Sequence, residues 1–440
     1  MGTSARYTAP VVLPCDEGPP VLRDAVVDVG PDGRITHVGP AAAAPVTDAP
    51  VTTLDGVLLP GLVNAHAHGP MTLLRGAGGD LPLMSWLRDV IWPAEGRLRA
   101  PDVRTGMRLA CVEMLRAGVT TSVEMYFYSE QIAEAVLEVG SRALVTPGII
   151  AVPGWDRLGS WQDMLAAVSA WIDADGLRSG PGERIELGYG PHAAYTLPPE
   201  ALVETAAAAR ERGALVHVHV AESRGEDEEL RAAHGSVPAY LDALGVLAGT
   251  RVLAAHAVHL SAEDVALFAR RGVAVAHCPG SNAKLASGVA DLAGLRRAGV
   301  AVGLGTDGAA SNDDLDLWEE LRLAALLSRL ASADAAALTA PEVLLMATRG
   351  GAAALGRDDL GVLRPGAWAD LVHVSADGPA FVRGTDTPDT QLVANLVWAA
   401  GGRAVRDVWV AGEQVLAGGE PTRVDAARLR AEVAATAARL

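Results

Sequence analysis

One unit recurs along the middle of the chain: an amphipathic helix, a glycine, an apolar strand and a polar residue at the strand's end. The helix expected over 198–212 ends at Gly213, and the strand that follows it ends at His219. The same order recurs after three further glycines, which are Gly118, Gly272 and Gly299. Glycine commonly ends a helix in this way. Apolar strands that alternate with helices are typical of a parallel sheet covered on both faces, so the pattern predicts an α/β fold.

Polar residues stand where the successive strands end. They are His66, His68, Glu124, His192, His219, His256, His277 and Asp307. In a (β/α)8 barrel, the rim at the carboxyl ends of the strands is where active sites are built. An open doubly wound sheet would more often carry a glycine-rich fingerprint after its first strand, and here His-x-His occupies that place. We therefore predict a (β/α)8 TIM-type barrel over residues 58–366.

Both ends of the chain differ from this middle part. Residues 1–57 read as short strands, two of which flank the turn signal Pro31-Asp32-Gly33. After residue 366, two more strand-like runs precede a helix expected over 424–440. We predict that 1–57 and 367–440 join into a small β-sandwich domain beside the barrel.

Composition excludes several classes of protein. The chain has 440 residues and a net charge of −17, without a basic stripe that would bind nucleic acid. Its three cysteines, Cys15, Cys111 and Cys278, are too scattered for a disulfide framework. No apolar run is long enough to cross a membrane, and residues 1–6 do not begin a signal peptide. We expect a cytoplasmic protein with neither a nucleic-acid nor a membrane partner.

Four of the strand-end residues suit a catalytic metal. His66 and His68 lie two apart in a strand, so they project to the same side. With His219 and Asp307 they would offer three nitrogens and one oxygen from three strand ends, leaving a position for water. Without a cysteine, this set suits zinc or iron(II). Taken alone, each histidine could be a packed core residue and the aspartate could be an ordinary turn residue. The prediction therefore depends on the four residues together.

The number of metal ions follows from the lysine content. Binuclear sites in such barrels are commonly bridged by a carbamylated lysine from a strand in the middle of the barrel. Lys284 is the only lysine in the chain, and it falls in the loop after His277-Cys278-Pro279. We expect one divalent metal per chain.

Two further residues suit proton transfer. Glu222 follows His219 by three residues, on the loop or first helical turn above the metal, where a carboxylate can move a proton from water to a leaving amine. The alternative is a solvated member of the acidic run 222–229. His256 ends an apolar strand, and we prefer a role in polarising the metal's water to that of a buried hydrogen-bonding histidine. For His217 and His277, two roles stay open: support of the site or packing in the core.

These stretches together resemble the metal-dependent amidohydrolase superfamily, in its cytosine-deaminase-like branch. The matching stretches are 60–68, 190–192, 219–222, the strand that ends at His256, 277–285 and 305–312. Residues 71–76 and 86–95 are most similar to the deaminases of S-adenosylhomocysteine and 5'-methylthioadenosine.

The resemblance implies a hydrolase that deaminates the cyclic amidine of an adenosine-type nucleoside: 5'-methylthioadenosine, S-adenosylhomocysteine, 5'-deoxyadenosine or adenosine. Hydroxide held by the metal would attack C6, Asp307 would accept its proton, and Glu222 would protonate the ring nitrogen as ammonia leaves. Glu95 would hold the ribose hydroxyls. The resemblance implies four other substrate contacts, which are Trp86, His192, Glu222 and Ser311.

One segment departs from that pattern. Thr146-Pro147-Gly148 has proline where the related enzymes place an arginine, and neither Arg142 nor Arg157 aligns with that role. Another amino- or halo-heterocycle therefore stays open as substrate, such as guanine, 8-oxoguanine, aminodeoxyfutalosine or an s-triazine. A non-catalytic binding protein on the same barrel is a third alternative. We also expect a homo-oligomer.

Overall fold

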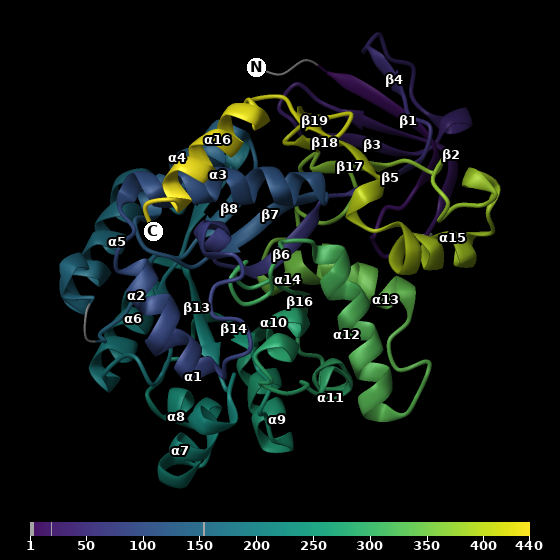
Figure 1. The fold of residues 1–440 in the computed structure, drawn as a ribbon. Coiled ribbons are helices and arrows are strands. Elements are labelled where there is room, and N and C mark those ends of the chain that lie inside the picture. Colours follow the sequence, from purple (N-terminus) through teal and green to yellow (C-terminus); the bar gives the residue numbers. More distant parts are fainter. Residues whose placement is uncertain (1–3, 19, 153–154) are drawn as a thin grey trace.

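The computed structural model describes residues 4–18, 20–152 and 155–440. Two sheets organise this part of the chain: a barrel surrounded by helices, and a second sheet that contains strands from both chain ends (Figure 1). None of the helices in the described ranges is both long and apolar enough to cross a membrane.

The barrel has eight parallel strands within the described residues. In chain order they are β6 (Leu62–Ala67), β7 (Val119–Glu124), β8 (Arg142–Val145), β11 (Ile185–Leu187), β13 (Leu215–Val220), β14 (Arg251–His256), β15 (Ala274–His277) and β16 (Val302–Leu304). The first and last strands, β6 and β16, are neighbours. The circle closes between β11 and β13, where Tyr189 bridges Val216 and Ala193 bridges His219. The predicted (β/α)8 barrel is confirmed.

Helices between the strands cover the outside of the barrel. They are α3 (Ala100–Arg116), α4 (Ser129–Val139), α5 (Trp161–Asp175), α6 (Pro199–Arg212), α9 (Ala262–Arg271), α11 (Leu292–Arg297), α12 (Leu317–Ser332), α13 (Ala340–Leu345) and α14 (Gly351–Ala354). Those predicted over 101–117 and 198–212 are correct to within a residue. The predicted capping box of α9 is also present: the Ser261 hydroxyl accepts from the Asp264 amide.

Short helices and strands lie around the carboxyl ends of the barrel strands. They are α1 (Leu83–Trp86), α2 (Trp92–Glu95), α7 (Arg224–His234), α8 (Val237–Ala243), α10 (Pro279–Lys284) and the pair β9 (Gly148–Ile149) and β12 (Gly190–Pro191). At the other side of the barrel, β10 (Arg178–Ser179) pairs antiparallel with β11.

The second sheet joins the two ends of the chain. Its strands are β1 (Ala5–Val12), β2 (Leu22–Val29), β3 (Ile35–Pro40), β4 (Val51–Thr53), β5 (Val57–Pro60), β17 (Leu371–Val374), β18 (Val405–Val410), β19 (Glu413–Ala417) and β20 (Glu420–Pro421). β5 pairs with β1 on one side and with β17 on the other.

This second sheet folds over on itself. Tyr7 in β1 and Trp409 in β18 are three strand spacings apart along the sheet, and neighbouring strands are about 4.8 Å apart. Yet their ring centroids are only 4.8 Å apart, in an edge-to-face contact. The apolar side chains between the two halves therefore form a core of their own, as the predicted β-sandwich requires.

Two elements differ from the expected boundaries. The barrel, expected from residue 58, begins at Leu62 instead, because the apolar run 57–63 is divided between β5 of the second sheet and β6 of the barrel. Between them, a Cβ on Gly61 would lie 1.9 Å from Thr120 Oγ1, so the crossing requires glycine. The terminal helix α16 (Ala426–Ala437) packs on α3 of the barrel (Figure 1). A further helix, α15 (Asp389–Asn395), lies between β17 and β18 in the chain.

Candidate metal-dependent active site

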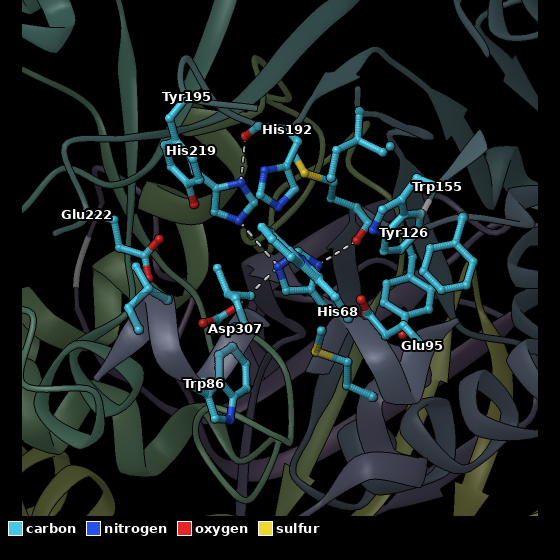
Figure 2. Close-up of a pocket in the computed structure, with 18 of the residues that line it drawn as sticks. His68, Trp86, Glu95, Tyr126, Trp155, His192, Tyr195, His219, Glu222 and Asp307 are labelled. Carbon is cyan, nitrogen blue, oxygen red and sulfur yellow. Dashed lines mark hydrogen bonds and ion pairs between the residues drawn. The ribbon is translucent and has the colours of Figure 1, made fainter. Parts of the chain in front are cut away.

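The four predicted metal ligands meet at one end of the barrel, and Figure 2 shows three of them, His68, His219 and Asp307. His66 lies in β6 and His68 directly after it, His219 comes from β13, and Asp307 from the turn after β16. Asp307 Oδ1 lies 3.3 Å from His66 Nε2 and 3.2 Å from His68 Nε2, and 3.4 Å separates the Nε2 atoms of His68 and His219. All four side chains are buried.

The protonation of His66 follows from the residues behind it. The Thr146 hydroxyl donates to the Glu124 carbonyl, so it accepts from His217 Nδ1 at 3.0 Å. His217 Nε2 is then unprotonated and accepts from His66 Nδ1 at 2.8 Å. His66 Nε2 is left with a lone pair, and it has no hydrogen-bond partner within the described ranges. His217 thus supports a metal ligand, one of the two roles left open for it.

The other two histidines are held in the same tautomer by backbone carbonyls. His68 Nδ1 donates to the Met125 carbonyl, and His219 Nδ1 donates to the His192 carbonyl at 2.7 Å. The Nε2 lone pairs of all three imidazoles therefore converge beside a carboxylate, and three such nitrogens with one oxygen suit a divalent cation. These residues fit the metal that the sequence predicts.

Asp307 is fixed by hydroxyl groups on its other side. Its Oδ2 accepts from Ser281 Oγ at 2.6 Å and from Ser311 Oγ at 2.7 Å. Burial opposes its ionisation, but its interactions with the neighbouring His66 and His68 hold the pKa of Asp307 well below its usual range. Ser311, expected to contact substrate, instead supports Asp307 and is not among the residues that line the cavity described below. Ser281 was not singled out from the sequence.

Glu222 and His256 lie next to each other above this cluster. Glu222 Oε1 is 3.9 Å from His256 Nε2, while His256 Nδ1 is 3.0 Å from Asn282 Oδ1. Burial raises the pKa of Glu222, which suits a group that takes up and releases a proton. His256 has a φ of +69°, an unfavourable backbone conformation for histidine that is typical of functional sites.

A cavity of about 730 Å³ lies over the cluster, within the part of the chain that the structure describes (Figure 2). It is lined by four of the five expected substrate contacts, which are Trp86, Glu95, His192 and Glu222. Glu95 is 4% exposed, and burial raises its pKa to about 7. The Arg157 guanidinium donates to the backbone carbonyl of Glu95 at 2.9 Å.

The rest of the cavity wall is apolar and aromatic. Residues that the sequence analysis did not identify are Met71, Leu83, Leu87, Trp92, Met125, Tyr126, Phe127, Gly148, Ile150, Trp155, Leu158 and Tyr195. The chain has only three Phe and six Tyr. The run Tyr126-Phe127-Tyr128 directly after β7 was therefore a signal that could have been used.

Of the two arginines near Pro147 in sequence, Arg142 lies in the interior and Arg157 at the surface. Arg142 is buried and forms two hydrogen bonds with Asp370, at 2.9 and 3.0 Å, so it does not reach the cavity. Arg157 is exposed, lies 5.6 Å from the centroid of the Trp155 ring and donates to the Tyr128 hydroxyl at 2.9 Å. Of the two, only Arg157 lies beside the cavity.

Lys284 is directed away from the four ligands. Its ammonium group contacts Asp313 Oδ2 at 2.6 Å and the Ala310 carbonyl at 3.1 Å. His277 is buried, and burial lowers its pKa to about 3, so it is neutral. It is not among the residues that line the cavity.

Known proteins resemble this chain over most of its length. The sequence model of the amidohydrolase family matches residues 57–415, and the chain belongs to that family. It is 43% identical to a 5-methylthioadenosine/S-adenosylhomocysteine deaminase of Pelotomaculum thermopropionicum, over 96% of each chain. An adenosine deaminase structure from Xanthomonas campestris with bound zinc has a TM-score of 0.92 at 38% identity and covers 99% of this chain and 98% of its own. An atrazine chlorohydrolase structure from Arthrobacter aurescens, also with zinc, has a TM-score of 0.89 at 26% identity, covering 98% and 100%.

Proposed function

We propose that this protein is a zinc-dependent hydrolase that removes the 6-amino group of an adenosine-type nucleoside and releases ammonia, with one metal ion per chain. The observation that carries the proposal is one cavity that brings two kinds of polar group together. Its wall contains His68, His219 and Asp307 of the metal-binding cluster, and it also contains the buried carboxylate of Glu95. The cluster suits a ring carbon that carries an amino group, and the Glu95 carboxylate suits a pair of ribose hydroxyls.

The residues around the cluster provide the proton transfers. A divalent cation at this site makes a water molecule nucleophilic at neutral pH. Asp307, kept ionised and fixed by two hydroxyl groups, accepts the proton of the attacking water. Glu222, with its raised pKa, gives a proton to the ring nitrogen beside the attacked carbon. His256, whose Nε2 lies 3.9 Å from Glu222 Oε1, would orient the attacking water.

The apolar wall supports a particular kind of 5' substituent. Phe127, Ile150, Trp155 and Leu158 line the cavity, and Pro147 stands where related enzymes use arginine. These side chains favour a 5'-methylthio or 5'-deoxy group over a charged amino-acid tail. Arg157 is the one described arginine beside this wall that could pair with such a tail, and it already contacts Tyr128 and Glu95.

The test is ammonia release by the zinc-loaded protein from a panel of substrates: 5'-methylthioadenosine, 5'-deoxyadenosine, adenosine, S-adenosylhomocysteine, adenine, guanine and an s-triazine. We expect the first three to have the highest kcat/KM, and adenine to be poor because it leaves the buried Glu95 carboxylate unpaired. Turnover confined to free bases or triazines would overturn the nucleoside assignment.

Hydrolysis of another heterocycle is the second candidate. The similarity to an atrazine chlorohydrolase structure, noted above, supports it, since the same barrel can serve different leaving groups. In the panel, chloride or ammonia release from the triazine at a rate above that of any nucleoside would favour this candidate.

A further inference from the structure

Glu320 is a buried carboxylate that the proposed mechanism does not use. It lies on α12, has no exposed surface, and binds two backbone or side-chain donors. Its Oε2 accepts from the Gly280 amide at 2.9 Å, and its Oε1 accepts from Asn312 Nδ2 at 2.9 Å. Glu320 therefore joins helix α10 to the segment that follows Asp307.

Helix α10 carries two side chains that reach the active site. Ser281 donates to Asp307, and Asn282 lies 3.0 Å from His256 Nδ1. Gly280, immediately before them, is bound by Glu320 at the first turn of the helix. A Cβ on Gly280 would lie 2.3 Å from Glu320 Oε1, so the close approach of the carboxylate to this backbone requires glycine.

The segment after Asp307 is held in a similar way. The Ser311 hydroxyl donates to Asp307 Oδ2. The side chain of Asn312 donates to Glu320, and the backbone amide of Asn312 donates to the Gly308 carbonyl at 3.0 Å. The two hydroxyl groups on Asp307 thus come from two segments, and Glu320 connects both.

We propose that Glu320 is a positioning residue, which fixes α10 against residues 307–312 so that Asp307 and His256 keep the orientation that catalysis needs. The inference rests on the proposed function for its kinetic part only. Its structural part concerns α10 and the affinity for zinc, which can be measured without any substrate. Residues that orient a metal ligand in this way commonly change metal affinity or activity when they are replaced.

The experiment compares Glu320→Ala with Glu320→Gln and with Glu319→Ala, an exposed neighbour on the same helix. In the full-length protein, Glu320→Ala should raise the zinc Kd and lower kcat by roughly 10-fold or more, while KM for the nucleoside stays near the wild-type value. Backbone amides of 279–285 should exchange with deuterium faster. Glu320→Gln should restore only part of each property, because its single carbonyl oxygen can accept from Gly280 or from Asn312 while its NH2 group cannot accept from the other. Glu319→Ala should match the wild type.

A double mutant tests whether Glu320 acts through Ser281. If it does, the Ser281→Ala and Glu320→Ala effects on zinc Kd will not add. Additive effects, or a Glu320→Ala protein with wild-type zinc Kd and amide exchange, would overturn the proposal. If Glu320→Ala does not fold, Asn312→Ala removes one of the two partners at a half-buried position and should raise the zinc Kd less. Absence of deaminase activity in the wild type would contradict the proposed function alone, since the zinc and exchange measurements would still decide the role of Glu320.

Discussion

His217 lies directly behind His66, with 2.8 Å between His217 Nε2 and His66 Nδ1. This contact, fixed by Thr146 on the far side of His217, leaves the Nε2 lone pair of His66 directed at the other ligands. The tautomer of a metal ligand is thus set by a histidine that never touches the metal position.

Replacing His217 should therefore weaken metal binding. In His217→Asn, the shorter side chain loses the acceptor for His66, and we expect the zinc Kd to rise roughly 10- to 100-fold. Thr146→Val, which removes the hydroxyl behind His217 but leaves the contact between His217 and His66, is the matched control and should cost less. Competition with a chelator of known affinity measures both, and equal affinities for the wild type and His217→Asn would contradict this account.

Glu222→Gln separates proton transfer from metal binding. Glutamine keeps the shape of the side chain but cannot carry a proton, so kcat should fall by about 10²–10⁴ while the zinc content stays unchanged. Single-turnover kinetics with metal analysis of the same sample is the appropriate measurement. A metal-loaded mutant with near-full kcat would show that another group moves the proton.

Glu95 should make nucleoside binding depend on pH. Burial raises the pKa of its carboxyl to about 7, so the side chain is neutral below that pH and ionised above it. Only the ionised form can accept from both ribose hydroxyls. We expect the ratio of kcat/KM for adenosine to that for 2',3'-dideoxyadenosine to rise as pH increases through about 7, and to become flat in Glu95→Ala. A ratio independent of pH in the wild type would contradict the role of Glu95.

The buried ion pair between Arg142 and Asp370 should matter for stability rather than for activity. Asp370→Ala leaves the guanidinium in the interior without its carboxylate, which costs about 3–5 kcal/mol of the free energy of unfolding. Glu134→Ala, which breaks an exposed pair with Arg104, should cost at most about 1 kcal/mol. Denaturant unfolding measures both losses. Equal decreases in the free energy of unfolding would show that the buried pair contributes no more to stability than the exposed pair.

The barrel and the clustering of His66, His68, His219 and Asp307 could be predicted because their signals are local. Each strand is a short apolar run after a helix and a glycine, and the polar residue at its end is adjacent in sequence to the strand that positions it. His66 and His68 need only the alternation of a strand to project together. Membership of the amidohydrolase family was likewise predictable from these motifs and is confirmed.

Contacts between distant segments could not be predicted in the same way. Ser311 was expected at the substrate, but its partner depends on how the turn after β16 packs against α10. The division of the apolar run at Gly61 depends on Thr120, a residue in a different strand. Arg142 stands near Pro147 in sequence, and its place in the interior depends on Asp370, far along the chain.

The pairing of β5 with β17 has a consequence for biosynthesis. A ribosome makes β5 early, whereas its antiparallel partner, in which Val372 pairs with Leu59, emerges only after the whole barrel. Until β17 is made, one edge of the apolar strand β5 has no partner. An unpaired strand edge of this kind can pair with other chains and cause aggregation. Closing so long a loop also slows folding. The nascent protein thus depends on its last quarter to complete the sheet that its first residues begin.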